Sequence, residues 1–194
     1  YAGQHFTGGD KVYLANPDLT SPTEIDIGGG HVASAQIDGS QVFVAATTGV
    51  YTFGPGDSTG VRLSDVEAER LSISNNYVYY TSAPDTGVPA VQAVPTKGTG
   101  NTPITIASGS PLLTLPIGIA ADSEFVYIAD EGDLSQPSTG QLIRCPIAGC
   151  GVGGADAVIL TTGAAKGGNP RTIVNDVDAI YWGSRVGQIW KLAK

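Results

Sequence analysis

Short runs in which hydrophobic and polar residues alternate dominate this chain, and five of these runs share one pattern. The five copies are residues 12–17, 50–55, 90–95, 141–146 and 188–193. Four copies end in proline, at Pro17, Pro55, Pro95 and Pro146, with steps of 38, 40 and 51 residues between them. Strict alternation predicts half-buried strands. The common proline position indicates an internal repeat of about 40 to 50 residues.

Two further elements recur around this strand. Before it stands an apolar run, a turn of Asp, Asn, Ser or Gly, and a second run built on Val-Phe, Val-Tyr or Ile-Tyr, which is typical of a hairpin. The copies of the hairpin are residues 35–47, 71–83, 119–131 and 173–185. After the proline comes a fourth run, at 24–30, 61–64, 104–109 and 158–163. The repeating unit therefore has four strands.

Four-stranded antiparallel units at this spacing predict an all-β fold, a β-propeller with about five blades' worth of chain in one domain, residues 1–194. We expect three whole blades at 33–64, 69–108 and 117–162, with incomplete blades at 1–30 and 171–194. A β-sandwich is the alternative, but it does not explain the repeated proline.

The two incomplete units both contain the proline-type strand, so they do not merge into one blade. The chain is interpreted either as part of a longer propeller that lacks upstream blades, which we favour, or as a five-bladed ring with irregular closure. It begins with YAGQHF and contains no Met, and we interpret it as a mature or truncated product.

Composition excludes several classes of function. The 194 residues have a net charge of −8, and their ten basic residues are scattered singly. A nucleic-acid partner is therefore not expected. No apolar run has the length of a membrane span.

The two cysteines, Cys145 and Cys150, lie in the fourth copy of the repeated strand and the turn that follows it. Their spacing is too wide for a redox C-x-x-C motif. Zinc would need about two more ligands, and the only other soft ligands in the chain are His5 and His31, both far upstream. We predict a disulfide across the turn and hence an oxidising compartment. Two free thiols are the alternative.

Residues 118–163 and 180–194 resemble repeats of secreted β-propeller proteins from myxobacteria and related bacteria, in an Ile-Ala-x-Asp turn, a Val-Tyr strand and a Cys-Pro-x-x-Gly-Cys segment. Residues 1–60 depart most from that pattern. The resemblance implies the fold and export to the cell surface, periplasm or medium. A more distant resemblance is to the propellers of lactonases and streptogramin lyases, but no motif here places their catalytic residues.

Asp38, Asn75, Asp122 and Asp176 recur at the turn of the predicted hairpin. Such side chains usually cap their own turn. The alternative is contact with a ligand or with Ca²⁺ at one face of the propeller. Asp130, with Glu131 and Asp133, falls in a longer segment, 129–140, that we expect to be a solvated loop with a potential binding role.

The remaining chemical signals are weak. Residues 149–154, GCGVGG, match G-x-G-x-x-G in form, but a strand and not a helix is expected next, so the glycines are assigned to a turn. His31 could face the central channel, although a structural or solvent-exposed role is the alternative. Trp182, Trp190, Tyr127 and Tyr181 are assigned to the blade core, with carbohydrate stacking as a subordinate alternative.

Three functions remain. The first is a non-enzymatic extracellular binding or scaffold propeller with a protein or glycan partner. The second is a lactonase-like hydrolase or lyase with a metal, for example Ca²⁺, at the channel. The third is a structural component that assembles through open blade edges. The chain has two His residues and no catalytic motif such as G-x-S-x-G, which favours the first and third.

Overall fold

The computed structural model describes residues 2–3, 11–14, 22–83, 87–109, 111–136, 139–163 and 169–194, without the side chains of 2, 3 and 14. Pro17 of the repeat and His5 lie outside these residues. The described chain forms five antiparallel sheets, each from consecutive strands. The first is β1 (Ala2–Gly3), β2 (Lys11–Leu14) and β3 (Thr23–Ile25).

The other four sheets follow in chain order, and we call them the second to fifth sheets. The second holds β4 (Val32–Asp38), β5 (Gln41–Ala46), β6 (Gly49–Phe53) and β7 (Val61–Ser64); the third β8 (Arg70–Ser74), β9 (Tyr77–Ser82), β10 (Ala90–Pro95) and β11 (Ile104–Ser108). The fourth holds β12 (Pro116–Ala121), β13 (Phe125–Asp130), β14 (Gln141–Pro146) and β15 (Val158–Thr162); the fifth β16 (Pro170–Asn175), β17 (Ala179–Ser184) and β18 (Ile189–Ala193). A 3₁₀ turn, Val152–Gly154, precedes β15.

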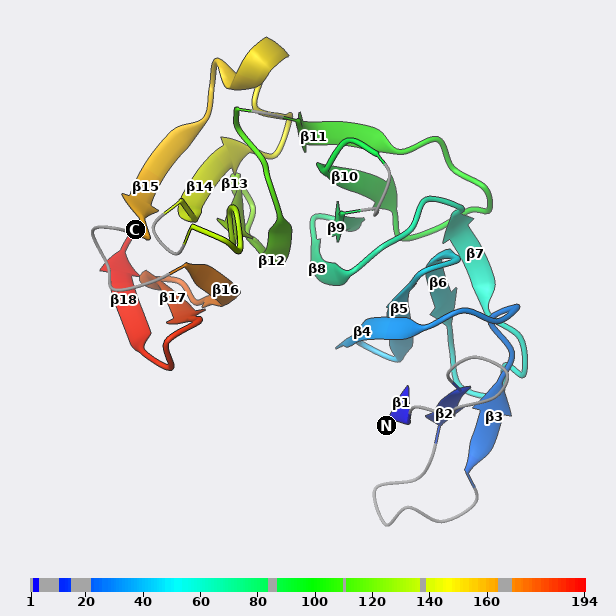
Figure 1. Cartoon of the computed structure of the whole chain (residues 1–194). Coiled ribbons are helices and arrows are strands. Elements are labelled where there is room, and N and C mark those ends of the chain that lie inside the picture. Colours follow the sequence, from blue (N-terminus) through cyan, green and yellow to red (C-terminus); the bar gives the residue numbers. More distant parts are fainter. Residues whose placement is uncertain are drawn as a thin grey trace.

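The sheets lie one after another along a curved row, with β4, β8, β12 and β16 on its concave side (Figure 1). This is the blade arrangement of a β-propeller, so the predicted fold class is confirmed. Irregularities repeat as well. In the second, fourth and fifth sheets, the pairing of the first two strands has a register shift at the same place. In the second, third and fourth sheets, the pairing of the third and fourth strands has a shift at another shared place.

Apolar side chains fill the spaces between neighbouring sheets. Ile128 and Ile143 of the fourth sheet pack against Tyr79 of the third. On the other face of the fourth sheet, Tyr127 and Leu142 pack against the fifth. Each inner sheet is thus covered on both faces at its centre, which is why its second strand is buried along most of its length and not at alternate positions only.

The proline register is less regular than the sequence suggested. Pro95 opposes Tyr77 and Pro146 opposes Phe125, at equivalent places in their hairpins. In the second sheet, Phe53 opposes Val42, so the equivalent place falls on Gly54, and Pro55 lies one residue beyond it. The prediction of one register for all the prolines was therefore wrong for Pro55. Proline lacks an N–H, and a strand end tolerates it over more than one position.

Candidate functional site

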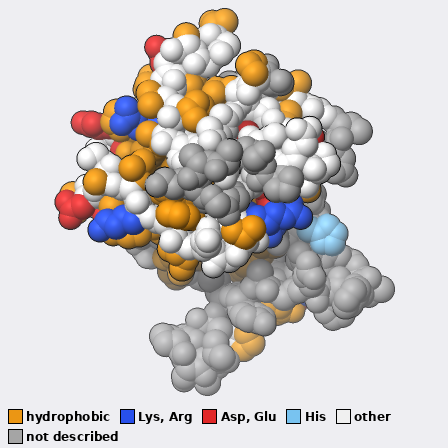
Figure 2. All heavy atoms as spheres, turned by 60° about the vertical axis from the view of Figure 1, so that its left-hand side comes forward, with side chains coloured by type: hydrophobic (Ala, Val, Ile, Leu, Met, Phe, Trp, Pro, Cys, Tyr) orange, Lys and Arg blue, Asp and Glu red, His pale blue; other side chains and the backbone are white. Residues whose placement is uncertain are grey.

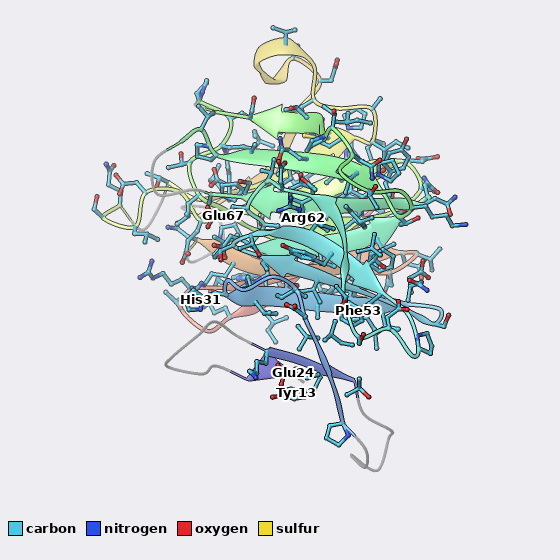
Figure 3. The ribbon with its side chains drawn as sticks, turned by 90° about the vertical axis from the view of Figure 1, so that its right-hand side faces the viewer. Tyr13, Glu24, His31, Phe53, Arg62 and Glu67 are labelled. Carbon is cyan, nitrogen blue, oxygen red and sulfur yellow. A yellow bond between two sulfur atoms is a disulfide. The ribbon has the colours of Figure 1, made fainter. Side chains whose placement is uncertain are left out.

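The turns between the first and second strands of the second to fifth sheets all lie on one side of the row, which we call the turn face. These turns contain residues 39–40, 75–76, 123–124 and 177–178. Viewed along the row, Phe53 lies toward this side and His31 lies at the opposite end of the strands (Figure 3). His31 therefore belongs to the other face. It is exposed, and its N–H donates to Thr47 Oγ1 at 3.0 Å.

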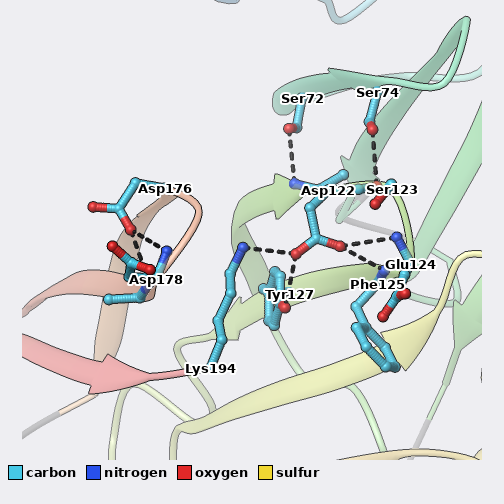
Figure 4. A network of polar contacts seen from close by, with 12 residues as sticks. Ser72, Ser74, Asp122, Ser123, Glu124, Phe125, Tyr127, Asp176, Asp178 and Lys194 are labelled. Atoms are coloured by element: carbon cyan, nitrogen blue, oxygen red, sulfur yellow. Dashed lines mark hydrogen bonds and ion pairs between the residues drawn. The ribbon is translucent and has the colours of Figure 1, made fainter.

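Asp122 is the centre of a polar network on the turn face (Figure 4). Its Oδ1 accepts the backbone N–H groups of Glu124 at 2.9 Å and Phe125 at 2.8 Å. Its Oδ2 accepts the Tyr127 hydroxyl at 2.9 Å and Lys194 Nζ at 2.7 Å. Asp122 is therefore a turn cap that also ties Lys194, at the end of the fifth sheet's third strand, to the fourth sheet.

The contacts of this network shift the pKa values of Asp122 and Tyr127. Partial burial opposes the charge on Asp122, but the hydrogen bonds from Lys194, the two backbone N–H groups and Tyr127 outweigh it and lower the pKa of Asp122 to about 2. Burial, reinforced by the hydrogen bond to Asp122, raises the pKa of Tyr127. The pair therefore stays carboxylate and neutral phenol at ordinary pH.

Asp176 repeats this geometry one sheet further on. Its Oδ1 accepts the N–H groups of Asp178 and Ala179, and its Oδ2 accepts the Tyr181 hydroxyl at 2.9 Å. The backbone N–H of Asp178, with Tyr181 and Ala179, lowers the pKa of Asp176. In both turns the Asp side chain acts as the cap that its residue type favours.

A pocket of about 570 Å³ opens between these two turns. Its lining residues come from the fourth and fifth sheets and are Ala121, Asp122, Ser123, Glu124, Phe125, Tyr127, Arg144, Asn175, Asp176, Val177 and Lys194. Arg144 stacks over the Phe125 ring with its guanidinium carbon 4.5 Å from the centroid, and Lys194 Nζ lies 5.3 Å from the Tyr127 centroid. The pocket is within the usual size range for ligand sites. It presents charges of both signs and aromatic rings that cations already cover.

A second groove, of about 390 Å³, lies at the equivalent place between the second and third sheets. Asp38, Phe43, Asn76 and Lys97 are among its lining residues. The junction between the third and fourth sheets differs, because Ser74 Oγ donates to the Asp122 carbonyl at 2.8 Å and Asn75 Nδ2 donates to the Ser123 carbonyl at 3.0 Å.

The prediction that Asn75 is the counterpart of the turn aspartates was wrong. The equivalent residue is Ser74, since Ser74 opposes Tyr77 as Asp38 opposes Gln41. Asn75 is a left-handed turn residue with φ 51°. Asparagine tolerates this conformation better than most residues, so the sequence marked the turn correctly but misplaced the end of the strand by one position.

The structure thus gathers two of the five candidates, Asp122 and Asp176, into one pocket. Asp38 lies in the second groove, and His31 and Asp130 lie elsewhere. Among the described residues, no group of three His, Cys, Asp or Glu side chains is placed to hold a metal ion. Arg144 and Lys194 were not among the site residues expected from the sequence. They line the pocket because strand pairing brings Arg144 of β14 and the end of β18 beside the turn.

The expectation of a solvated loop at 129–140 was wrong for its first two acidic residues. Asp130 is 1% exposed and accepts the N–H groups of Thr114, Leu115 and Gly132. Burial raises the pKa of Asp130, although these N–H groups oppose the shift. Glu131 is 2% exposed, with Arg171 Nε at 3.4 Å and Arg185 Nη1 at 3.3 Å. Buried charge is retained where it has such partners, so these residues anchor the loop.

The cysteines form the predicted disulfide. Cys145 is the next-to-last residue of β14, Cys150 follows the turn after that strand, and both side chains are 0% exposed. The N–H of Cys150 also donates to the Ile106 carbonyl of the third sheet at 2.7 Å. The disulfide therefore fixes a turn that contacts the neighbouring blade.

On the side of the molecule that carries the last two sheets, basic and acidic side chains form a few small groups among hydrophobic and neutral ones (Figure 2). None of the described helical residues form a segment long and apolar enough to cross a membrane.

Comparison with known proteins supports the fold. The chain is similar to a chain of the Nidogen/Laminin complex, with TM-score 0.65 and 16% identity over 95% of this chain and 68% of that one. It is similar to BamB from Moraxella catarrhalis, with TM-score 0.63 and 11% identity over 100% of this chain and 58% of that one. It is also similar to the PQQ-bound aldose sugar dehydrogenase from Streptomyces coelicolor, with TM-score 0.62 and 14% identity over 99% of this chain and 74% of that one.

No protein-family model matches the chain, and no curated protein matches it in sequence. At the identities found, structural likeness reports the architecture only, because one fold supports many functions. The structural neighbours are β-propeller proteins and include both a protein complex and an enzyme. The chain therefore has the β-propeller fold.

Proposed function

We propose that this chain is a non-enzymatic, extracellular or periplasmic β-propeller that binds a protein partner through the pocket between the fourth and fifth sheets. The observation that carries the proposal is the construction of that pocket. It has carboxylates at Asp122 and Asp176, fixed on the turns of the fourth and fifth sheets, and cations at Arg144 in β14 and at Lys194 after β18. Such an arrangement suits a polypeptide segment with charges of its own, because complementary charges fix register and orientation.

A protein partner is favoured over a glycan by the state of the aromatic rings. Glycan sites commonly offer an open ring face to a sugar, whereas here Arg144 covers Phe125 and Lys194 lies over Tyr127. The structurally similar chain of the Nidogen/Laminin complex belongs to an assembly of proteins, which is compatible with this choice.

Location outside the reducing cytosol is supported by the disulfide. The bond between Cys145 and Cys150 is buried, and such bonds persist mainly in oxidising compartments. The resemblance to secreted propellers supports the same location.

The test is selection of binders from a random peptide display library on the immobilised 194-residue chain. Selected peptides should bind at least 10-fold more weakly to the Arg144→Glu variant and equally well to Lys97→Glu, which reverses a charge in the second groove. Equal binding to all three proteins would overturn the choice of pocket. Turnover of a lactone or ester panel that EDTA abolishes would overturn the non-enzymatic assignment.

A further inference from the structure

The turn of the second sheet contains an Asp-Gly sequence, Asp38-Gly39, which occurs nowhere else in the 194 residues. Asn-Gly does not occur in the sequence at all. At an Asp-Gly bond the residue after the aspartate has no side chain to shield its backbone nitrogen. The side-chain carboxyl group and this nitrogen are the two groups that combine when an aspartyl residue forms a cyclic imide.

The aspartates at the equivalent turns of the fourth and fifth sheets are held away from this reaction. Oδ1 of Asp122 and of Asp176 accepts two backbone N–H groups of its own turn, and Oδ2 accepts a tyrosine hydroxyl, as Figure 4 shows for Asp122. A carboxylate fixed in this way must break these hydrogen bonds before it can turn toward the next backbone nitrogen. We therefore expect both residues to form an imide slowly.

Asp38 lacks this cap. In the other two turns the tyrosine, Tyr127 or Tyr181, stands five residues after the aspartate. The residue at that place in the second sheet is Phe43, which has no hydroxyl. Among the described residues, no hydrogen bond or ion pair holds the Asp38 carboxylate. Asp38 is also exposed, so its side chain is free to change rotamer.

The other reacting group, the backbone nitrogen of Gly39, is accessible as well. Gly39 and Ser40 form an exposed turn between the paired residues Asp38 and Gln41. Gly39 has φ 60°, and outside its chain neighbours no heavy atom lies within 4 Å of the position that a Cβ would take. The backbone hydrogen bonds of the described turns do not engage its N–H. Both reacting groups are therefore free in the folded chain.

We propose that Asp38 is a modification site at which the folded chain forms isoaspartate. The Gly39 nitrogen attacks the Asp38 carboxyl carbon, the new C–N bond closes a succinimide, and one carboxyl oxygen leaves as water with the amide proton and the carboxyl proton. Water then adds to the main-chain carbonyl of the imide, breaks its bond to nitrogen and returns a proton to that nitrogen. The chain now continues through the side-chain carbonyl, and the α-carboxyl group is free. The steps need water and no oxidant, reductant or cofactor.

The modification changes the second groove, because Asp38 is one of its lining residues. Isoaspartate inserts a methylene into the main chain, so the tight turn that fixes the register of β4 and β5 becomes longer. The carboxylate also moves from the side chain to the main chain. The pocket between the fourth and fifth sheets keeps its two capped aspartates. The two sites on the turn face therefore age differently.

The test is prolonged incubation of the folded 194-residue chain at neutral pH in heavy-oxygen water. Asp38 should incorporate the label and become isoaspartate at least about 10-fold faster than Asp122 or Asp176, since each hydrogen bond of a cap adds to the barrier. Peptide mass spectrometry locates the label, and a protease that cleaves at aspartate but not at isoaspartate distinguishes the two products. A free peptide of residues 33–43 serves as the clock.

Three variants assign the signal. Asp38→Glu keeps the carboxylate but lengthens the side chain, which disfavours the ring, and it should abolish the signal. Phe43→Tyr supplies the hydroxyl that the other turns have, and it should slow the conversion about 5-fold, the effect of one hydrogen bond. The matched control Ser40→Ala changes the same exposed turn without touching either reacting group and should react as the parent does.

Unfolding removes the caps, so in denaturant the rates at Asp122 and Asp176 should rise relative to the rate at Asp38. A folded chain with no conversion at Asp38 when the free peptide has converted would overturn the proposal, and so would equal rates at the three aspartates of the folded chain. Relative rates that are the same folded and unfolded would also overturn it, because the local sequence alone would then set them.

Discussion

Two junctions on the same face of this propeller are built from equivalent turns but end in different surfaces. Between the third and fourth sheets, Ser74 and Asn75 donate across to the carbonyls of Asp122 and Ser123 and hold the two turns together. Between the fourth and fifth, Asp122 and Asp176 each turn back onto their own backbone, and a pocket of about 570 Å³ lies between them.

The residue type at the end of the first strand contributes to this difference, beside the contacts of Ser72 and Asn75 across the first junction. Serine is a hydroxyl donor that reaches the neighbouring carbonyl, whereas aspartate is only an acceptor and collects its own turn's N–H groups. Both junctions have an apolar layer beneath the turns. We therefore expect substitutions in these layers to change the free energy of unfolding most, and substitutions in the turns to change it less.

Trp182→Ala should give the largest effect. Trp182 is 3% exposed in the apolar cluster between the fourth and fifth sheets. Its loss should reduce the free energy of unfolding by about 3–5 kcal/mol, as for other buried aromatic truncations. Urea denaturation measures this loss, and the exposed Val177→Ala in the same sheet is the control. Equal losses in the two variants would contradict the assignment of Trp182 to the core.

Removal of the disulfide should give the next largest effect, and it acts at the closed junction. Replacing both Cys145 and Cys150 with Ala should lower the free energy of unfolding by about 2 kcal/mol, the low end for disulfides because the loop is short. Thermal unfolding with and without reductant checks the value. Mass spectrometry should find no alkylation of the unreduced, unfolded chain, and two labels added there would show free thiols.

Asp122→Ala should cost about 1–2 kcal/mol, since it removes a turn cap and the partner of Lys194. The pKa of Asp122 is about 2 when folded, below its ordinary 3.8, so its contribution is present above pH 4. It should be lost as the pH falls from about 4 to about 2. Unfolding free energies across this range should show that loss in the parent and less of it in Asp122→Asn. Asp176→Asn, at the more exposed equivalent turn, should change the profile less, and a larger change there would reverse the assignment.

Ser74→Ala should have the smallest effect, about 0.5–1.5 kcal/mol, the usual contribution of one hydrogen bond. Its distinctive result should be faster amide exchange in the β12–β13 turn, because Ser74 Oγ no longer holds the Asp122 carbonyl. Hydrogen–deuterium exchange of residues 122–125 measures this, with Ser40→Ala in the exposed turn of the second sheet as the control. Unchanged exchange would show that the hydrogen bond from Ser74 does not hold this turn.

Much of the fold was readable from the sequence, because each blade repeats one short-range pattern. The Val-Tyr and Ile-Tyr runs became the second strands β9, β13 and β17, and the disulfide was predictable from two cysteines across one short turn. The site was less readable. The aspartates of the turns stand out by type, but Arg144 and Lys194 come from distant strands whose approach depends on how the sheets pair and pack.

Burial was the property that local sequence conveyed least. Asp130 and Glu131 look like loop acids, yet they are buried because backbone N–H groups and two arginines, supplied from other segments, compensate their burial. Ile189 stands in a strand like its equivalents, yet it is exposed because no described element covers it. For the two acids, most of the deciding partners are remote in the chain.

The sequence by itself determined the all-β blade pattern, the positions of the turns and the Cys145–Cys150 pair, since these depend on alternation and turn chemistry over a few residues. Only the tertiary structure decided which side chains bridge neighbouring sheets and which acidic residues are buried. These features depend on contacts between sheets, that is, on whether another blade supplies a hydrogen-bond donor or an apolar side chain at that place.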